Sequence, residues 1–201
     1  MREREAETKA NGTLQKTKAS LRNQMTSALS RIRLSAREAA SAQGLALLQR
    51  QEAWREASSI LFFAPLPMEL NVWPLLADAI GNGKTVSLPR FVAESGQYEA
   101  CRVEDPTRDV QPGRFGIREP IPLCPVVPLN RLDFILVPGV AFDLHGRRLG
   151  RGKGFYDQLL AEVRGTTCGV AFDEQIVREV PVEPHDVVLN CILTPTRWIE
   201  L

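Results

Sequence analysis

Residues 133–160 read DFILVPGVAFDLHGRRLGRGKGFYDQLL, and this stretch decides the fold prediction. It opens with the apolar run 134–137, which ends at Pro138 and Gly139 and so predicts a short buried strand. A glycine-rich loop follows, and residues 155–160 then begin a helical pattern. The whole chain has a net charge of only +1. Any basic character must therefore be local, and the cations of this loop are where it concentrates. They are Arg147, Arg148, Arg151 and Lys153.

The loop between the predicted strand and helix has the composition of an anion-binding site. Glycines at 146, 150, 152 and 154 let backbone N–H groups approach a ligand closely. A helix start adds unpaired N–H donors, and arginine can bind phosphate oxygens in pairs. The loop is not a P-loop, because no Ser or Thr follows Lys153, and not GxGxxG, because Phe155 takes the last glycine position. Phosphate binding and a plain glycine-rich turn with solvated arginines both remain open from these residues alone.

Residues 137–160 also resemble the signature of the 5-formyltetrahydrofolate cyclo-ligase family, whose members are also called methenyltetrahydrofolate synthetases. The family form is approximately PG-AFD-G-RLG-GKGYYD-L, and about twenty positions correspond. Phe155 is the one visible departure, since the family commonly has Tyr there; the ring is kept and a hydroxyl is lost. The resemblance covers residues 18–194, and its further elements lie at 18–22, 113–120, 171–175 and 180–186.

The resemblance implies that the chain binds ATP together with Mg²⁺. Lys18 and Arg22 are similar to the family's K-LR element, whose Lys and Arg contact ATP phosphates; spacing alone indicates only a solvated helix face for this pair. We expect Lys153, Arg148 and Tyr156 to be catalytic. The loop residues expected to bind the nucleotide are Arg148, Leu149, Gly150, Arg151, Gly152, Lys153, Gly154, Phe155 and Tyr156.

Glu69 lies just after the first predicted strand, where ligands of parallel sheets bind. Charge compensation at a helix N-terminus explains its position equally well. The resemblance implies that this Glu binds the folate, although the family context E-[VIL]-x-T reads Glu-Leu-Asn-Val here and lacks the Thr. The residues predicted to bind the folate are Ala64, Glu69, Phe155 and Tyr156.

Two aspartates are candidate Mg²⁺ ligands, because Mg²⁺ binds one or two carboxylates together with substrate phosphates. Asp157 follows the glycine loop and Asp186 precedes a predicted strand, so a structural role at the end of an element is the alternative for each. The resemblance favours the metal, since the YYD and HD aspartates are the metal-associated positions of the family. His145 and His185 receive no functional assignment.

The order of the predicted elements indicates an α/β fold. A strand at 59–64, a helix at 72–80 and a strand at 85–89 make a β-α-β unit, which implies a parallel pair with a right-handed crossover. The resemblance implies a three-layer α/β/α fold with a mostly parallel central sheet, similar to sugar-phosphate isomerase and CoA-transferase-like folds. We expect residues 16–201 to form this single domain, after a disordered or loosely helical tail at 1–15.

The other segments are assigned from local patterns. A helical apolar stripe begins at Thr17, and the capping-box pattern of Ser35 and Glu38 predicts a second helix that runs to about Trp54. The prolines of residues 121–130 exclude a helix there. Further strands are predicted at 97–103, as an edge strand, and at 166–172 and 187–194.

Composition narrows the function classes. With 201 residues, 44% apolar and 24% charged, the chain is typical of one globular domain, and the small net charge argues against nucleic-acid or membrane partners. No apolar run has the ~20 residues of a membrane span, and the charged start lacks the apolar core of a signal peptide. The four cysteines form no CxxC pair, so we expect them to be buried residues of a protein in the reducing cytoplasm. We also expect a monomer.

The chemistry follows from the resemblance and by exclusion. There is no GxSxG motif, and the cysteines have no neighbouring base in the sequence. The resemblance implies ATP-dependent ring closure of 5-formyltetrahydrofolate to 5,10-methenyltetrahydrofolate, through a phosphorylated formyl group, with release of ADP and phosphate. Two alternatives remain: a non-catalytic folate or nucleotide binding module, and a sugar-phosphate isomerase with Asp143 as its base.

Overall fold

The computed structural model describes residues 2–183 and 186–201, with side chains from residue 12 onward except Phe115. Its helices are α1 (Arg2–Ser30), α2 (Leu34–Leu48), α3 (Glu52–Glu56), α4 (Trp73–Gly81) and α5 (Phe155–Leu160), with 3-10 turns η1 (Arg114–Gly116), η2 (Leu129–Arg131) and η3 (Asp173–Gln175). The strands of the main sheet are β1 (Ser59–Leu61), β2 (Thr85–Val92), β3 (Gln97–Val103), β6 (Val126–Val127), β7 (Phe134–Pro138), β10 (Thr166–Val170), β12 (Cys191–Leu193) and β13 (Trp198–Glu200). The remaining strands are β4 (Val110–Pro112), β5 (Arg118–Pro120), β8 (Ala141–Asp143), β9 (Arg148–Leu149) and β11 (Ile176–Val177).

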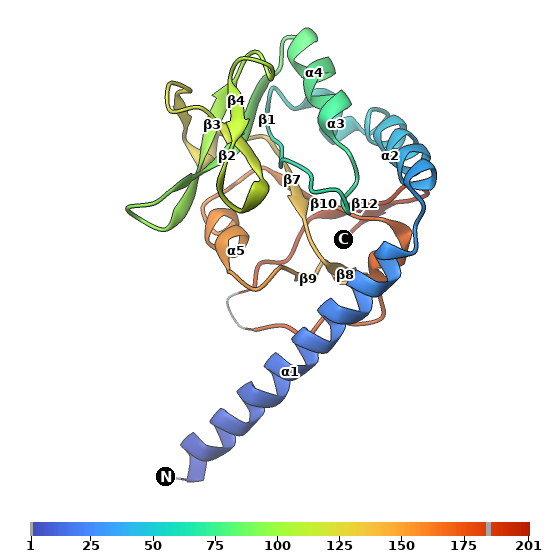
Figure 1. Cartoon of the computed structure of the whole chain (residues 1–201), viewed down its shortest axis with the longest axis vertical. Helices are drawn as coiled ribbons and strands as arrows, with labels where there is room; N and C mark the ends of the chain where they lie inside the picture. Colours follow the sequence, from blue (N-terminus) through green and yellow to red (C-terminus); the bar gives the residue numbers. More distant parts are fainter. Residues whose placement is uncertain (1, 184–185) are drawn as a thin grey trace.

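The main sheet has the order β13-β12-β10-β7-β1-β2-β3-β6 and is parallel in its centre (Figure 1). Strands β12, β10, β7, β1 and β2 pair in parallel, and antiparallel strands extend the sheet at both edges. Ser59 of β1 is in register with Thr85 of β2, so the predicted parallel β-α-β unit is confirmed. The predicted α/β protein with a mostly parallel central sheet is therefore confirmed.

Both faces of the sheet are covered, as the unbroken apolar run of β7 requires. Phe134 and Leu136 face a core that contains residues of α2, α3 and α4, while Ile135 and Val137 face a second core against α5. Trp54 of α3 packs edge-on against Phe134 with ring centroids 5.8 Å apart. Burial of an aromatic or aliphatic side chain of this size stabilises the fold by roughly 1.5–3 kcal/mol.

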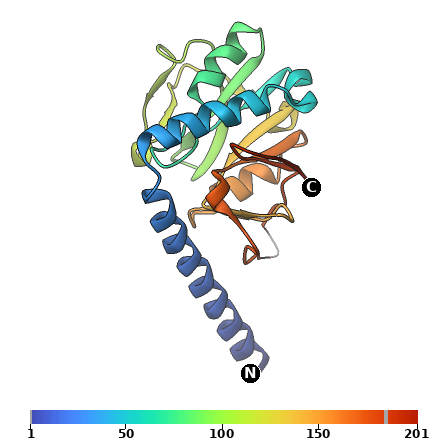
Figure 2. The same ribbon diagram turned by 90° about the vertical axis from the view of Figure 1, so that its right-hand side faces the viewer.

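Helix α1 leaves the body of the molecule and points away from the sheet in both views (Figures 1 and 2). It passes residue 15 without a break, so the boundary predicted between tail and domain does not coincide with the end of an element. Its second half is attached: Leu29 is buried, and Leu21 and Met25 pack on a small core formed by Ala141, Leu149 and Val180. This contact places α1 beside the glycine loop.

The second helix differs from its prediction. It begins at Leu34 with Arg33 as N-cap and without a side-chain cap, so the predicted capping box is wrong. The extended backbone of Arg33 (φ −65°, ψ 151°) puts Ser35 inside the first turn, where its hydroxyl cannot cap. The helix ends at Leu48 and α3 is separate, because the chain turns after Gln49, whose N–H bonds back to Leu45.

Two strand predictions also need correction. Residues 97–103 form β3 as expected, but β3 is not an edge strand, because Ala100 and Cys101 pair with β6. The last parallel strand is only Cys191–Leu193. Residues 187–189 are not part of it, since the N–H of Leu189 donates to the carbonyl of Gly146 instead. Among the helices of residues 2–183 and 186–201, none combines the length and apolar character needed to cross a membrane.

Candidate active site

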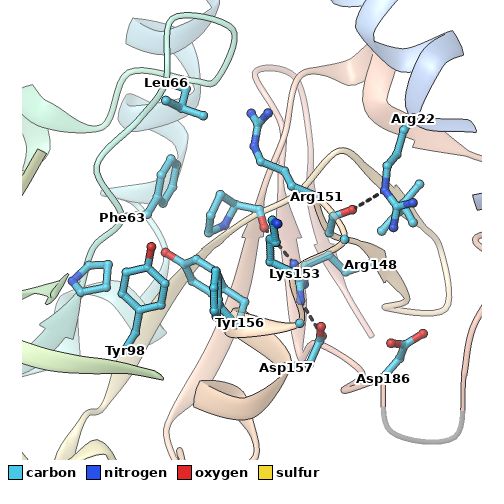
Figure 3. Close-up of a pocket in the computed structure, with 18 of the residues that line it drawn as sticks. Arg22, Phe63, Leu66, Tyr98, Arg148, Arg151, Lys153, Tyr156, Asp157 and Asp186 are labelled. Carbon is cyan, nitrogen blue, oxygen red and sulfur yellow. Dashed lines mark hydrogen bonds and ion pairs between the residues drawn. The ribbon is translucent and has the colours of Figure 1, made fainter. Parts of the chain in front are cut away.

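A pocket of about 710 Å³ lies beyond the carboxyl ends of β1 and β7, which are neighbours in the sheet (Figure 3). This is where ligands of open parallel sheets bind. The glycine loop and α1 form a wall rich in charged groups, and side chains that follow β1 or lie on β2 and β3 form a largely apolar wall. The lining residues are Gln15, Lys18, Arg22, Phe63, Ala64, Leu66, Glu69, Pro89, Tyr98, Ile117, Pro138, Gly139, Arg148, Leu149, Gly150, Arg151, Gly152, Lys153, Gly154, Phe155, Tyr156, Asp157, Glu183 and Asp186.

The glycine loop enters the pocket from a hairpin rather than directly from β7. Strands β8 and β9 pair in antiparallel fashion, and Gly146 closes their turn with φ 76°. A Cβ at Gly146 would approach the carbonyl oxygen of Leu189 to 2.7 Å, so this glycine is required by both conformation and space. Residues 151–154 then run exposed to the start of α5, with Gly152 and Gly154 at φ 94° and 68°. Their backbone is open to a ligand.

Helix α1 contacts the loop through Arg22. The Arg22 Nε donates to the Gly150 carbonyl oxygen at 2.9 Å (Figure 3). A Cβ at Gly152 would lie 3.5 Å from the Arg22 guanidinium carbon, so the loop backbone also packs on that side chain. Arg22 therefore fixes one end of the exposed loop and lines the pocket.

Lys18 of α1 forms ion pairs with the segment that precedes β12. Its Nζ forms ion pairs with Glu183 at 2.8 Å and Asp186 at 2.9 Å, and Lys18 is buried. Burial alone lowers the pKa of Lys18, but the hydrogen bonds and charges of the two carboxylates outweigh it and raise the pKa above the ordinary 10.5. Lys18 is thus a cation in the pocket, in contact with a predicted metal ligand.

Arg148 is buried and does not extend into solvent like the other loop cations. Its Nη2 lies 2.5 Å from Asp157 Oδ1, and its guanidinium carbon lies 5.8 Å from the ring centre of Tyr156. Its Nε is buried without a hydrogen-bond partner. The ion pair with Asp157 therefore holds Arg148 beside the start of α5. Both side chains line the same pocket.

The donor set fits a magnesium ion that takes most of its ligands from phosphate and water. Asp157 and Asp186 both line the pocket, each already near a cation. No cluster of three or more acidic, His or Cys side chains suited to a metal occurs in the described ranges 2–183 and 186–201. Mg²⁺ uses one or two carboxylates with substrate phosphates, and the chemistry of these two side chains fits such an ion.

Glu69 lies at the opposite wall. Its Oε2 accepts the N–H of Leu66 at 2.9 Å, and its Oε1 forms an ion pair with Arg151 at 2.7 Å. Tyr156 lies nearby; burial and then the charge of Glu69 raise the pKa of its phenol. Phe155 packs edge-on against Tyr98 at 5.2 Å, so it joins the apolar wall.

Comparison with known proteins agrees with this geometry. The family model described as the 5-formyltetrahydrofolate cyclo-ligase family matches residues 14–195. The chain belongs to the 5-formyltetrahydrofolate cyclo-ligase family. Membership makes it a ligase of folate one-carbon metabolism, as the sequence resemblance predicted, and implies the use of ATP.

Individual relatives support the assignment. A 5-formyltetrahydrofolate cyclo-ligase of Escherichia coli is 34% identical over 145 residues, which cover 70% of this chain and 80% of that protein. One from Mycolicibacterium smegmatis is 46% identical over 88 residues, which cover 42% of this chain and 45% of that one. The NMR structure of Aquifex aeolicus 5,10-methenyltetrahydrofolate synthetase matches with a TM-score of 0.83 and 30% identity over 92% of both chains.

The pocket of this family member brings together every residue predicted from the sequence as a ligand of ATP, folate or metal. Leu149 is among them, although its side chain packs mainly in the core with Leu21 and Met25. Asp143, in contrast, lies outside the pocket lining, and Pro184 and His185 lie outside the described residues. Sequence reasoning missed Gln15, Phe63, Leu66, Pro89, Tyr98, Ile117, Pro138, Gly139 and Glu183.

A signal for some of the missed residues was present. Glu183 belongs to the LP-E-HD element that carries Asp186, so its place beside Lys18 could have been inferred from that motif. Pro138 and Gly139 end the strand on which the fold prediction rests. Tyr98 had no such signal, because it reaches the pocket only through the pairing of β3 with β2.

Proposed function

We propose that this protein converts 5-formyltetrahydrofolate to 5,10-methenyltetrahydrofolate with Mg-ATP, releasing ADP and phosphate. One observation carries the proposal. The cationic glycine loop and the carboxylate of Glu69 face one pocket from opposite walls, joined by a single ion pair of 2.7 Å. Two ligands of different chemistry, a polyphosphate and a ring with N–H donors, can therefore meet there.

The nucleotide is assigned to the glycine loop. The backbone of residues 150–154 supplies N–H donors, and Lys153 has no ion-pair partner among the described residues, so it is available to a phosphate. Lys18 and Arg22 add positive charge from α1. Arg148 is buried beneath the loop, and its guanidinium adds positive charge to the proposed phosphate site. Tyr156 and Phe155 cover the junction between the two ligands.

Asp157 and Asp186 are the residues that would hold Mg²⁺. Both line the pocket on the side of the phosphate-binding loop. The ion supplies charge neutralisation to the phosphate oxygens when it is bound. Arg148 and Lys18 keep these carboxylates in place before the ligand arrives, since each is paired with one of them.

The folate is assigned to the apolar wall. Glu69 would accept ring N–H groups of the pterin, and Phe63, Leu66 and Tyr98 provide apolar surface around it (Figure 3). The side chain of Glu69 is only 9% exposed, so hydrogen bonds to its carboxylate are shielded from water. Ala64 follows β1 and lines the pocket, where a larger side chain would narrow it.

The proposed reaction needs positioning and charge neutralisation. The formyl group on the ring nitrogen is an amide and a poor electrophile. Its oxygen attacks the γ-phosphorus, the bond to the ADP oxygen breaks, and the formyl carbon becomes activated. The neighbouring anilino nitrogen then attacks that carbon, the C–O bond breaks, and phosphate leaves while the nitrogen loses its proton. Lys153 and Arg148 offset charge on the transferring group, which is the main contribution a protein makes to phosphoryl transfer.

The sugar-phosphate isomerase alternative lacks its base. Asp143 is fully buried and accepts backbone N–H groups from His145, Arg147 and Val180 at 2.9–3.1 Å. It therefore closes the β8–β9 turn and does not face the pocket, so the earlier assignment of Asp143 as a possible catalytic base is wrong.

The function is tested by mixing the protein with Mg-ATP and 5-formyltetrahydrofolate and following methenyl-folate absorbance in the near ultraviolet. Absorbance should rise and stop when either substrate is exhausted, and omission of ATP should abolish it. A non-catalytic binding module would bind both ligands in equilibrium dialysis and give no absorbance change. That result would contradict the proposed reaction while leaving the pocket assignment intact.

A further inference from the structure

One ion pair crosses the pocket from wall to wall. Arg151 extends from the glycine loop toward the side where Leu66 lies, whereas Lys153 remains near the loop (Figure 3). The Arg151 Nη2 lies 2.7 Å from Glu69 Oε1; the arginine side chain is 54% exposed and the glutamate side chain 9%. A cation of the nucleotide wall is therefore bonded to the carboxylate of the folate wall.

This ion pair occupies the oxygen that a folate ring would need. Glu69 Oε2 is already bonded to the N–H of Leu66, so both carboxylate oxygens have a partner in the structure. A ring that presents two N–H donors side by side requires both oxygens, in the way that arginine binds a carboxylate with two parallel bonds. Each carboxylate oxygen can accept a second hydrogen bond, so the Leu66 N–H does not exclude the ring at Oε2. The cationic guanidinium of Arg151, which also lines the pocket, and a ring N–H compete for the position at Oε1.

The loop is built so that Arg151 can change partner. Arg22 fixes the loop at Gly150, and α5 begins at Phe155. Between these points, residues 151–154 are exposed, and Gly152 and Gly154 have φ values of 94° and 68°. A bound polyphosphate carries several negative charges beside this backbone, while Glu69 carries one, so the guanidinium gains more by turning to the phosphates.

We infer that Arg151 couples the two substrates: it holds Glu69 while the loop is empty, and a polyphosphate on the loop draws it away and frees Glu69 for the folate. Arg151 is thus a positioning residue that acts through Glu69. The inference rests on the proposed function, because it needs both ligands in this pocket. By linkage, folate must strengthen nucleotide binding by the same factor.

The test is a binding cycle that involves no turnover. The Kd of 5-formyltetrahydrofolate is measured by titration calorimetry with and without Mg²⁺ and a non-hydrolysable ATP analogue. Wild type should bind folate at least about fivefold more tightly when the analogue is present, a coupling of ordinary size for two sites. Arg151→Gln should bind folate more tightly than wild type when the analogue is absent, and the analogue should then add less than twofold.

Two further variants show whether the coupling between the ligands depends on Arg151 itself or on the charge of any cation in the loop. Arg147→Gln removes a cation of the same segment that pairs with Glu179 at 3.5 Å outside the pocket, and it should keep the wild-type coupling. Arg151→Lys keeps the charge and should keep part of the coupling. Arg151 is half-exposed, so Arg151→Gln and Arg151→Lys should remain folded at the temperature of the titration, which thermal unfolding checks.

The outcomes are distinct. Two results would overturn the inference and leave the proposed function standing. One is coupling that survives in Arg151→Gln, and the other is a folate affinity of wild type that is equal with and without the analogue. Failure of wild type to bind either ligand would overturn both. Loss of coupling in Arg151→Gln together with tighter binding of folate alone is the supporting result, since a merely structural role of Arg151 predicts weaker binding in both conditions.

Discussion

The two walls of the pocket are built in different ways. The nucleotide wall is mostly one continuous segment, residues 148–157, with three residues of α1 beside it. The folate wall is assembled from Phe63, Glu69, Pro89 and Tyr98, which lie on or after different strands. A local segment can be recognised from sequence, whereas a wall that depends on strand order exists only once the sheet has formed. The two walls should also respond differently to mutation.

The largest effect of a mutation is expected at Arg148, the buried arginine of the nucleotide wall. Arg148→Ala leaves Asp157 without its partner in a pair whose side chains are 3% and 19% exposed. Breaking such a buried pair costs ~3 kcal/mol of unfolding free energy, and turnover should fall at least tenfold as well. Urea unfolding measures the first effect and the absorbance assay the second. An unchanged unfolding midpoint would show that the pair contributes no stability.

Lys153 should separate catalysis from stability within the same wall. It is exposed and has no ion pair in the described part of the chain, so Lys153→Ala should leave the unfolding free energy within about 0.5 kcal/mol of wild type. Turnover should nevertheless fall at least tenfold, because a charge on the transferring phosphoryl group is lost. Exposed Lys16, on α1 outside the pocket, provides the control Lys16→Ala, which should retain wild-type turnover. Wild-type rates in Lys153→Ala would remove Lys153 from the phosphate site.

Glu69 tests the folate wall. Glu69→Gln keeps an oxygen that can accept the Leu66 N–H but loses the charge and one acceptor. The KM for 5-formyltetrahydrofolate should rise about tenfold, the cost of a charged hydrogen bond, while the KM for ATP should change less than twofold. Steady-state kinetics with each substrate varied in turn, at saturation of the other, provides the measurement. Equal changes in both constants would mean that the walls are not divided between the two ligands.

The smallest effect concerns the attachment of α1 through Lys18. The pKa of Lys18 is raised in the fold, so its ion pairs stabilise the protein fully below pH 10.5 and are lost as pH rises from there through the folded value. The stability difference between wild type and Lys18→Met should therefore shrink between pH 10 and 12, as measured by thermal unfolding. The same comparison with Lys16→Met, which removes an exposed lysine of the same helix, should show no such trend.

The sequence predicted which residues form the charged wall of the pocket, because the signals for this wall are local. The apolar run of β7, the glycines and the helix start all lie within residues 134–160 and are found in that order. The local sequence pattern could not predict the partner and the burial of each cation. Four cations looked alike in the sequence, yet Arg147 pairs outside the pocket, Arg148 is buried on Asp157, and Arg151 reaches the opposite wall.

The folate wall was predicted only at the points where a motif marked it. Glu69 and Ala64 follow β1 and were found by that position. Tyr98 could not be assigned, because its place depends on the seven-residue antiparallel pairing of β2 with β3, which puts Tyr98 opposite Phe91. The capping box at Ser35 failed for a related reason: the extended backbone at Arg33, not a local side-chain cap, decides where α2 begins.

The central claim is that the loop from Gly150 to Gly154 binds the phosphates of a nucleotide. A crystal structure with Mg²⁺ and a non-hydrolysable ATP analogue tests it directly. Phosphate oxygens should lie within hydrogen-bond distance of the loop N–H groups and of Lys153 Nζ, with Arg151 turned away from Glu69. A nucleotide ordered elsewhere on the protein, above a loop unchanged from the structure described here, would contradict it.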